Sequence, residues 1–287
     1  MSKIIWLASY PKSGNTWFRI FLANYLSNGE PPIDINAIKV NLHAAGRPYF
    51  DEMTGVESAD LTDEEIARLR PAVYRRLAAE SKETPLFIKI HDALTDNGWG
   101  EPIVPLDATY GAIYFIRNVL DIAVSWAYHR PIPIEKSVVQ ISQPNYTVMK
   151  KRDMLCDQLV QKFLSWSHHV CSWVDTSGLR VLVLRYEDMV QNPLDSFEQA
   201  IKFIGLPLDT ERLNRALAFS SFAQLQQQEL EHGFRERPTN AKSFFRRGQI
   251  GGWRDELTQS QVDFLLDKHG QVMQRFGYLS PAGKLLV

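Results

Sequence analysis

The 287-residue sequence lacks an excess of charge of either sign. Its 32 basic and 33 acidic residues give a formal net charge of −1. No overall charge therefore favours binding to nucleic acid or to a membrane surface, and a site for an anion must be built locally. Cysteine is also scarce. Cys156 and Cys171 have no second Cys or His pair at metal-ligand spacing, so we expect neither a zinc site nor a disulfide framework. This cysteine usage favours a reducing, cytoplasmic compartment.

Long apolar runs are missing as well. The first run, "IIWLA" at 4–8, is too short for the core of a signal peptide or for a membrane span. No internal repeat, long linker or low-complexity tract divides the chain. We therefore predict one domain over residues 1–287, with no membrane span.

What is present is a regular alternation of two patterns. Short runs rich in Ile, Leu and Val are typical of strands covered on both faces, and they occur at 3–8, 85–91, 110–117 and 180–187. Helical patterns occur at 15–28, 61–81, 119–129, 153–174, 194–204 and 259–275. Thr62 is the expected cap of the second helix. This order predicts an α/β fold of three layers, in which helices flank a central parallel β-sheet.

Ligands of such a sheet bind beyond the carboxyl ends of its strands. Each of the four expected strands is followed by reactive side chains: residues 12–16 after the first, Lys89 and His91 at the end of the second, Arg117 and then Ser125 after the third, and Tyr186 after the fourth. A late stretch, "FFRRGQIGGWRDELT" at 244–258, adds Arg246 and Arg247 among glycines that no helix interior would favour.

The turn "SYPKSGNTW" at 9–17 joins the first strand to the first helix. Unpaired N–H groups and the positive end of the helix dipole at such a junction favour an anion such as a phosphate. The turn is not a Walker A loop, because its lysine precedes the glycine by two positions and no glycine stands five residues earlier.

Three stretches together resemble the sulfotransferases that use 3′-phosphoadenosine 5′-phosphosulfate (PAPS). "YPKSGNTW" resembles the family's 5′-phosphosulfate loop, "YFIRNVLDIAVSW" its 3′-phosphate element, and "FFRRGQIGGWRDELT" its C-terminal arginine–glycine loop. They follow one another in the family's order, from residue 4 to about 258. The resemblance implies a P-loop-like fold and an enzyme that moves a sulfuryl group from PAPS to a small-molecule acceptor, leaving 3′-phosphoadenosine 5′-phosphate (PAP).

The resemblance also implies the roles of individual residues. Lys12 would bind the 5′-phosphosulfate, Trp17 and Phe222 would stack on adenine, Tyr186 would hydrogen-bond its ring, and arginines would hold the 3′-phosphate. The nucleotide site would comprise Lys12, Ser13, Gly14, Asn15, Thr16, Trp17, Arg117, Ser125, Tyr186, Phe222, Arg246, Arg247 and Gly248.

Catalysis would depend on His91, which matches the family's histidine general base in "IKIH". An imidazole is mostly neutral yet basic near pH 7. Lys12 and Lys89 would stabilise the developing negative charge, so no metal ion is required. His129, His168 and His169 lack such a context and are interpreted as structural or surface residues.

Several positions depart from the family pattern. Asn15 stands where threonine is common, and Val119 stands where proline usually follows the arginine and asparagine. "RDELTQSQVD" at 254–263 departs from the dimer motif of animal members, so dimerisation by that route is not expected and the oligomeric state stays open. The opening "WLASYPKSGNTW" is more similar to bacterial small-molecule and natural-product members than to animal ones.

The acceptor stays open among phenols, sterols, lipids, sugars and peptides, with a hydroxyl expected rather than an amine. Three stretches at 29–57, 130–150 and 223–243 are interpreted as walls of its pocket, the first two as loop-rich, and their aromatic residues include Tyr49, Phe50, Tyr128, Tyr146 and Phe234. Two other functions are weighed: a phosphotransferase that uses ATP and magnesium, and a nucleotide-binding module without catalysis.

Overall fold

The computed structural model describes residues 3–29, 31–38, 40, 42–150 and 156–287. Contacts within the chain divide it into two compact units of three segments each. The first, here called the sheet unit, comprises Met1–Tyr10, Leu42–Tyr114 and Pro144–Val183. The second, the helical unit, comprises Pro11–Asn41, Phe115–Gln143 and Leu184–Val287. A single domain over residues 1–287 stays a prediction.

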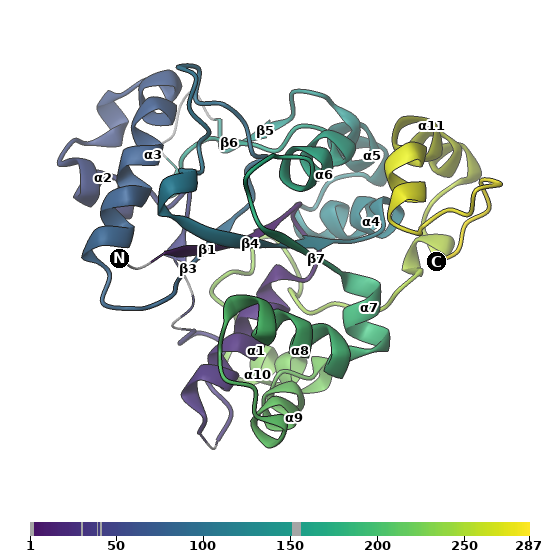
Figure 1. Ribbon diagram of the computed structural model, residues 1–287. Coiled ribbons are helices and arrows are strands. Elements are labelled where there is room, and N and C mark those ends of the chain that lie inside the picture. The colour runs from purple at the N-terminus through teal and green to yellow at the C-terminus, as the bar shows by residue number, and fades with distance from the viewer. Residues whose placement is uncertain (1–2, 30, 39, 41, 151–155) are drawn as a thin grey trace. The chain divides into compact units, whose positions relative to one another are not determined.

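A five-stranded sheet forms the centre of the sheet unit (Figure 1). Its strands are β1 (Ile4–Ser9), β2 (Leu42–His43), β3 (Leu86–Ile90), β4 (Thr109–Ile116) and β7 (Val181–Arg185), in the order β2-β3-β1-β4-β7. β4 and β7 each end two residues beyond the unit's boundary. β3 runs parallel to both β1 and β2. Every residue of β1 is buried, which is why this strand is apolar throughout instead of alternating. The expected parallel sheet is confirmed.

The remaining elements of the sheet unit are α2 (Arg47–Thr54), α3 (Asp63–Glu80), α6 (Trp166–Val174), the antiparallel pair β5 (Thr147–Val148) and β6 (Gln161–Lys162), and the 3₁₀ turns η1 (Ser58–Asp60) and η2 (Leu106–Ala108). The expected cap at Thr62 is confirmed. The Thr62 side chain accepts from the N–H of Glu65, and the Glu65 carboxylate accepts from the N–H of Thr62.

Two expectations in the sheet unit are wrong. The helix expected at 153–174 begins only at Trp166, because Ser165 caps it there by accepting from the N–H of His168, and part of the preceding stretch forms β6. Residues 151–155 of that expectation lie outside the described residues. The loop expected at 29–57 contains α2, whose Pro48 lies in the first turn, where proline favours a helix start.

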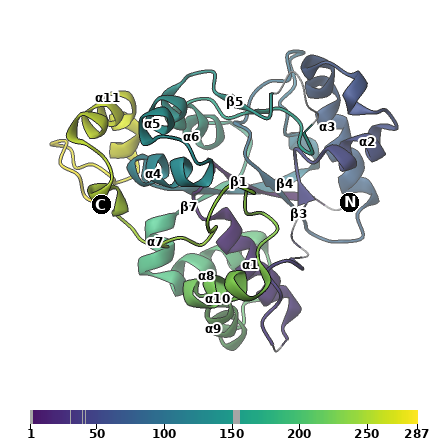
Figure 2. The same ribbon diagram turned by 180° about the vertical axis from the view of Figure 1, so that it is seen from behind.

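The helical unit contains α1 (Asn15–Ser27), α4 (Val119–His129), α5 (Ile134–Ser142), α7 (Tyr186–Gln191), α8 (Pro193–Ile204), α9 (Thr210–Phe219), α10 (Phe222–His232), the 3₁₀ turn η3 (Gly252–Asp255) and α11 (Gln259–Arg275). α9 packs against α1, α8 and α10, and α4 packs against α5 and α11 (Figure 2). The expected helices at 119–129 and 259–275 are confirmed.

Two further stretches expected as walls of the acceptor pocket contain helices. α5 begins directly after Pro133 and occupies 134–142 of the stretch 130–150, which was expected to be loop-rich, and α10 extends over 223–232 of the stretch 223–243. α5 was missed because the prolines of 130–150 were interpreted as signs of a loop. Proline is compatible with the first turn of a helix, where its missing N–H would have no partner.

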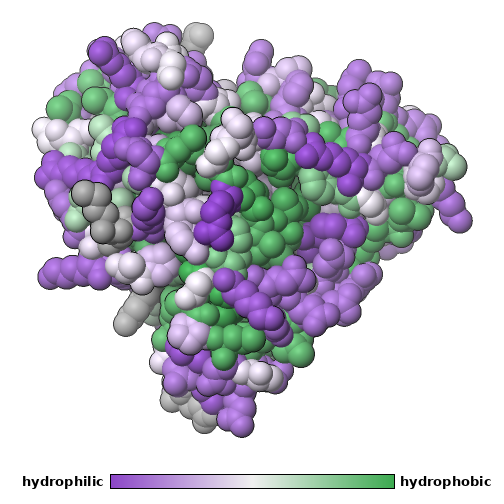
Figure 3. Space-filling model, viewed as in Figure 1, coloured by the Kyte–Doolittle hydropathy of each residue, from purple (hydrophilic) through white to green (hydrophobic). Residues whose placement is uncertain are grey.

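Polar and apolar residues separate as expected for a packed protein. In the helical unit, aromatic rings from α1 and α8 interlock, with Phe21 and Phe197 at a centroid distance of 4.3 Å. On the face drawn in Figure 3, hydrophilic side chains dominate the periphery and apolar ones gather towards the middle. Among the residues that the structure describes, no helix combines the length and apolarity needed to cross a bilayer.

His169 of α6 is completely buried in the sheet unit. Its Nδ1 lies 2.8 Å from the hydroxyl of Tyr114, and its Nε2 lies 3.1 Å from the carbonyl oxygen of His91. Burial lowers the pKa of the His169 imidazole to about 4. The folded protein therefore holds this ring in its neutral form near pH 7.

We predict that His169 makes the protein less stable in acid. Between pH ~6.5 and ~4 the unfolded chain protonates this histidine while the folded protein does not, so the free energy of unfolding falls by about 1.4 kcal/mol per pH unit as the pH is lowered through that window. Urea unfolding of the wild type and of His169→Phe at several pH values measures the difference in slope. Equal slopes would show that His169 titrates normally in the fold, and His168→Phe, at an exposed neighbour, is the control.

Candidate active site

The loop before α1 has the geometry of an anion site. Lys12 and Gly14 both have positive φ angles, 73° and 97°, and Gly14 occupies the N-cap position without a side-chain cap on the helix. The first turn of α1 contains no acidic residue. The Ser13 hydroxyl and the Trp17 Nε1 are buried and have no hydrogen-bond partner within the described part of the chain. Unpaired donors at a helix N-terminus suit a phosphate or sulfate group.

Arg117 connects this loop to the late glycine-rich stretch. Its Nη1 donates to the carbonyl oxygen of Lys12 at 3.2 Å, and its Nη2 donates to that of Gln249 at 2.9 Å. The guanidinium also lies 4.3 Å from the ring centroid of Tyr186. A C-β atom on Gly14 would come within 2.9 Å of the same ring, so only glycine fits there without displacing Tyr186. The loop at Lys12, the ring of Tyr186 and the stretch at Gln249 therefore meet around Arg117.

Asp121 holds the glycine-rich stretch in place. Its carboxylate accepts from the backbone N–H groups of Gly251, at 2.8 Å, and Trp253, at 3.1 Å. It is buried and lies one helical turn after Arg117, 3.8 Å away in an ion pair. Ser125 lies one turn further along α4 and is half-buried.

Arg246 and Arg247 share one carboxylate, that of Glu256. The distances are 3.4 Å from Arg246 Nη1 and 3.2 Å from Arg247 Nη2. Tyr128 donates to the other oxygen of Glu256, and its ring lies 3.9 Å from the Arg246 guanidinium. Tyr128 thus supports Arg246, and its place in an acceptor wall stays a prediction. Sequence reasoning missed Glu256, because its spacing from the arginines is not one that places side chains together in a regular element.

The ammonium group of Lys12 lies against Phe244 and His129. It is 4.1 Å from the centroid of the Phe244 ring and 3.5 Å from Nδ1 of His129. His129, interpreted above as structural or surface, is thus a neighbour of the lysine expected at the phosphosulfate. The signal for it was its position at the end of α4, about two turns after Asp121.

Two aromatic residues expected to stack on adenine have different surroundings. Trp17 is half-buried and packs edge-on against Tyr186 and Phe197, at centroid distances of 6.1 and 5.1 Å. Phe222, at the start of α10, packs against Gly248, where a C-β atom would come within 2.4 Å of the ring. Both residues lie in the helical unit with the phosphate-binding candidates.

His91 and Lys89 belong to the sheet unit. Lys89 is half-buried in β3, and His91 follows the end of that strand. His91 Nδ1 donates to the backbone carbonyl of Ser9 at 2.9 Å and lies 3.2 Å from the Ser9 hydroxyl. His43 and Phe163 lie edge-on to the His91 ring, at centroid distances of 5.9 and 6.4 Å. Sequence reasoning gave no role to His43, whose short strand carries no apolar pattern.

Comparison with known proteins decides the family. Residues 2–277 match the family model described as the sulfotransferase domain. The chain belongs to the sulfotransferase family. It is therefore an enzyme of PAPS-dependent sulfuryl transfer.

Individual relatives agree with this result. Sulfotransferase 1A1 of the dog, Canis lupus familiaris, is 26% identical over 273 residues, which cover 89% of this chain and 78% of the relative. Among solved structures, retinol dehydratase in a complex with retinol and PAP has a TM-score of 0.62 at 18% identity, covering 94% of this chain and 81% of that one. Mouse SULT7A1 complexed with PAP has a TM-score of 0.57 at 18% identity, covering 96% and 89%. The two structures show a shared, P-loop-like fold. The bacterial branch stays a prediction.

Within the described ranges, 3–29, 31–38, 40, 42–150 and 156–287, no group of three or more His, Cys, Asp or Glu side chains is placed to hold a metal ion. The positive charge around the loop before α1 comes from Lys12 and the arginines of the helical unit.

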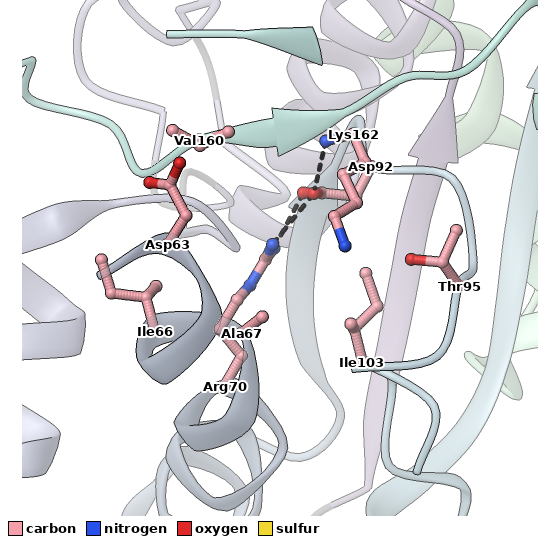
Figure 4. A pocket seen from close by; sticks show the side chains of 9 residues that line it. All are labelled: Asp63, Ile66, Ala67, Arg70, Asp92, Thr95, Ile103, Val160 and Lys162. Carbon is pink, nitrogen blue, oxygen red and sulfur yellow. Dashed lines mark hydrogen bonds and ion pairs between the residues drawn. The ribbon is translucent and has the colours of Figure 1, made fainter. Parts of the chain in front are cut away.

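A small cavity in the sheet unit lies beside Asp92, the residue after His91 (Figure 4). Its volume is about 30 Å³, which is room for water but not for an acceptor. Arg70 of α3 reaches across it to form a bidentate ion pair with Asp92, at 2.9 and 2.8 Å. Both side chains are buried. This cavity therefore belongs to the packing around the ion pair of Arg70 and Asp92.

We predict that Gly248→Ala lowers the free energy of unfolding of this sulfotransferase. Alanine at the φ of 62° costs about 1 to 2 kcal/mol in backbone strain, and the clash with Phe222 adds about 1 to 3 kcal/mol. Gly55→Ala is the matched control, because Gly55 has a φ of 70° and no atom within 4 Å of the added C-β. Denaturant unfolding measures both variants. Equal losses of stability would show that Gly248 and Phe222 are not in contact.

Proposed function

We propose that this sulfotransferase transfers the sulfuryl group of PAPS to a hydroxyl group of a small-molecule acceptor, with His91 as general base. The observation that supports the donor site most directly is the pair of hydrogen bonds from Arg117 to the carbonyls of Lys12 and Gln249. These bonds hold two stretches around the Arg117 side chain: the loop expected at the 5′-phosphosulfate of PAPS and the glycine-rich stretch expected at its 3′-phosphate.

The loop at 12–17 is proposed to bind the 5′-phosphosulfate. Ser13, Gly14, Asn15 and Thr16 would offer N–H and hydroxyl donors at the start of α1, and Lys12 would follow the negative charge that builds on the bridging oxygen. The unpaired Ser13 hydroxyl and the absence of an acidic first turn fit this role.

The 3′-phosphate is proposed to lie against Arg117, Ser125, Arg246, Arg247 and the N–H of Gly248. The Arg117 Nε is buried and has no partner within the described residues, so it is available to an anion. A guanidinium has five N–H donors, and Arg246 and Arg247 can therefore keep Glu256 while binding phosphate oxygens. Trp17, Tyr186 and Phe222 are proposed to contact adenine.

His91 is suited to accept the proton of the acceptor hydroxyl. The carbonyl of Ser9 can only accept a hydrogen bond, so Nδ1 of His91 carries the hydrogen and the lone pair is on Nε2. In the proposed step a bond forms from the acceptor oxygen to sulfur, the bond from sulfur to the 5′-phosphate oxygen breaks, and Nε2 takes the proton. Lys12 and Lys89 are proposed to stabilise the charge on the transferred group and the leaving phosphate.

The acceptor is proposed to be a small molecule. One neighbour in structure is titled a complex of retinol dehydratase with retinol, and another a complex with androsterone. Around His91 of this chain the side chains of Phe163 and Tyr146 are buried and pack edge-on at 6.0 Å, which would give the acceptor an apolar surrounding. We propose that the enzyme acts in the cytoplasm, the compartment that its cysteine usage favours.

We predict that PAP binds far more tightly than adenosine 5′-phosphate, which lacks the 3′-phosphate. Calorimetric titration of both ligands, and of ATP with and without magnesium, measures the preference. Arg247→Ala should weaken PAP about 10- to 100-fold, the loss of a charge-assisted hydrogen bond, and leave adenosine 5′-phosphate unchanged. Arg254→Ala, at an exposed arginine of the same stretch, is the control. A preference for ATP with magnesium would instead favour a phosphotransferase.

We also predict that His91→Ala loses about 100- to 10,000-fold in kcat for sulfuryl transfer while PAP affinity is unchanged, because general base catalysis has that magnitude. The assay uses PAPS and a panel of hydroxylated acceptors. His168→Ala, at an exposed histidine, should retain full activity. Unchanged turnover of the His91 variant would remove the histidine from the mechanism and favour a different base.

A further inference from the structure

A closed circuit of hydrogen bonds surrounds the backbone of His91 in the sheet unit. The N–H of Tyr10 donates to the Tyr114 hydroxyl, which donates to Nδ1 of His169 at 2.8 Å. Nε2 of His169 donates to the carbonyl of His91 at 3.1 Å, and Nδ1 of His91 donates to the carbonyl of Ser9 at 2.9 Å. Ser9 and Tyr10 are consecutive, so the chain closes the circuit.

The direction of every bond in this circuit is fixed by its backbone members. A carbonyl only accepts and an N–H only donates. Nε2 of His169 must therefore carry a hydrogen, and Nδ1, in a neutral ring, must accept from Tyr114. His169 and Tyr114 are fully buried, so no water competes for these atoms. The circuit admits one arrangement of protons, and in it Nε2 of His91 has the lone pair.

The residue after His91 is held from the same helix. Trp173, one turn after His169 on α6, donates its Nε1 to the carbonyl of Asp92 at 3.0 Å. The Asp92 carboxylate in turn accepts from Arg70 and from the N–H of Lys162 (Figure 4). Two successive carbonyls at the end of β3 are thus fixed by two side chains of α6. A packed helix is a rigid support, whereas a strand end without it would fray.

We propose that His169 and Tyr114 are positioning residues of the sulfotransferase, which hold the backbone and the proton arrangement of His91 ready for proton abstraction. The inference depends on the proposed role of His91 as the base. Neither residue touches the reacting atoms in this scheme. Their contribution is to keep His91 in reach, since a misplacement of about 1 Å at an active site costs about 100-fold in rate.

The test compares variants of His169 with matched controls. His169→Phe removes the donor to the His91 carbonyl but keeps a buried ring, and it should lower kcat about 100-fold with PAP affinity unchanged. His169→Gln, whose amide can donate from a position near that of Nε2, should recover part of the loss. His168→Phe makes the same substitution at an exposed neighbour and should have no effect.

Tyr114→Phe removes only a hydroxyl, and it gives a second readout if His169→Phe does not fold. It should lower kcat about 10-fold, and the double variant Tyr114→Phe/His169→Phe should be no worse than His169→Phe alone, because both act through one bond to His91. Additive losses, or full activity in both single variants, would overturn the proposal.

Nitrogen-15 NMR of the histidine rings gives a readout that needs no turnover. In the wild type, His91 should show hydrogen on Nδ1 alone, and in His169→Phe a mixture of the two tautomers. The same single tautomer in both proteins would overturn the positioning role. If the wild type transfers no sulfuryl group, the proposed function fails, while the NMR result still decides whether His169 orders His91.

Discussion

The proposed donor site of this sulfotransferase depends on one guanidinium. Arg117 follows β4 and donates to the carbonyls of Lys12 and Gln249, residues that are 237 positions apart in the chain. A planar, permanently charged group with several donors can satisfy two backbone carbonyls and still face an anion. Asp121 complements it one turn later by accepting from the N–H groups of Gly251 and Trp253. Together they give an irregular, glycine-rich stretch a fixed course, which a loop without secondary structure could not maintain alone.

The sheet unit uses the same principle for a different purpose. Backbone carbonyls at the ends of β1 and β3 can only accept hydrogen bonds, and they therefore dictate which ring nitrogen of His91 and of His169 carries hydrogen. Burial of His169 excludes a charged ring, since desolvation lowers its pKa to about 4. In both units, polar side chains are ordered by backbone groups whose donor or acceptor character cannot change.

Several features were predictable because they depend on neighbouring residues alone. The helix at 119–129 follows Asn118, whose side chain caps it, and α3 follows the Thr62 capping box. The strands are continuous apolar runs. The prediction of a helix at 153–174 was wrong because apolar periodicity continued upstream of the cap at Ser165, where the chain instead pairs as β6. The pairing of Glu256 with two arginines and the place of His129 beside Lys12 were missed, because each joins residues whose patterns look like solvated charge or helix surface.

By itself, the sequence determined the chemistry available to the protein: a lysine turn before a helix, arginines after a strand and among glycines, and a histidine at a strand end. These are local arrangements of a few residues, and side-chain type and spacing are enough to define them. Only the tertiary structure decided which of these groups share partners, that Phe222 packs on Gly248, and that His169, interpreted as structural or surface, hydrogen-bonds the backbone of His91. The physical reason is that each of those contacts joins distant parts of the chain, and its geometry is set by packing of whole elements instead of by adjacent residues.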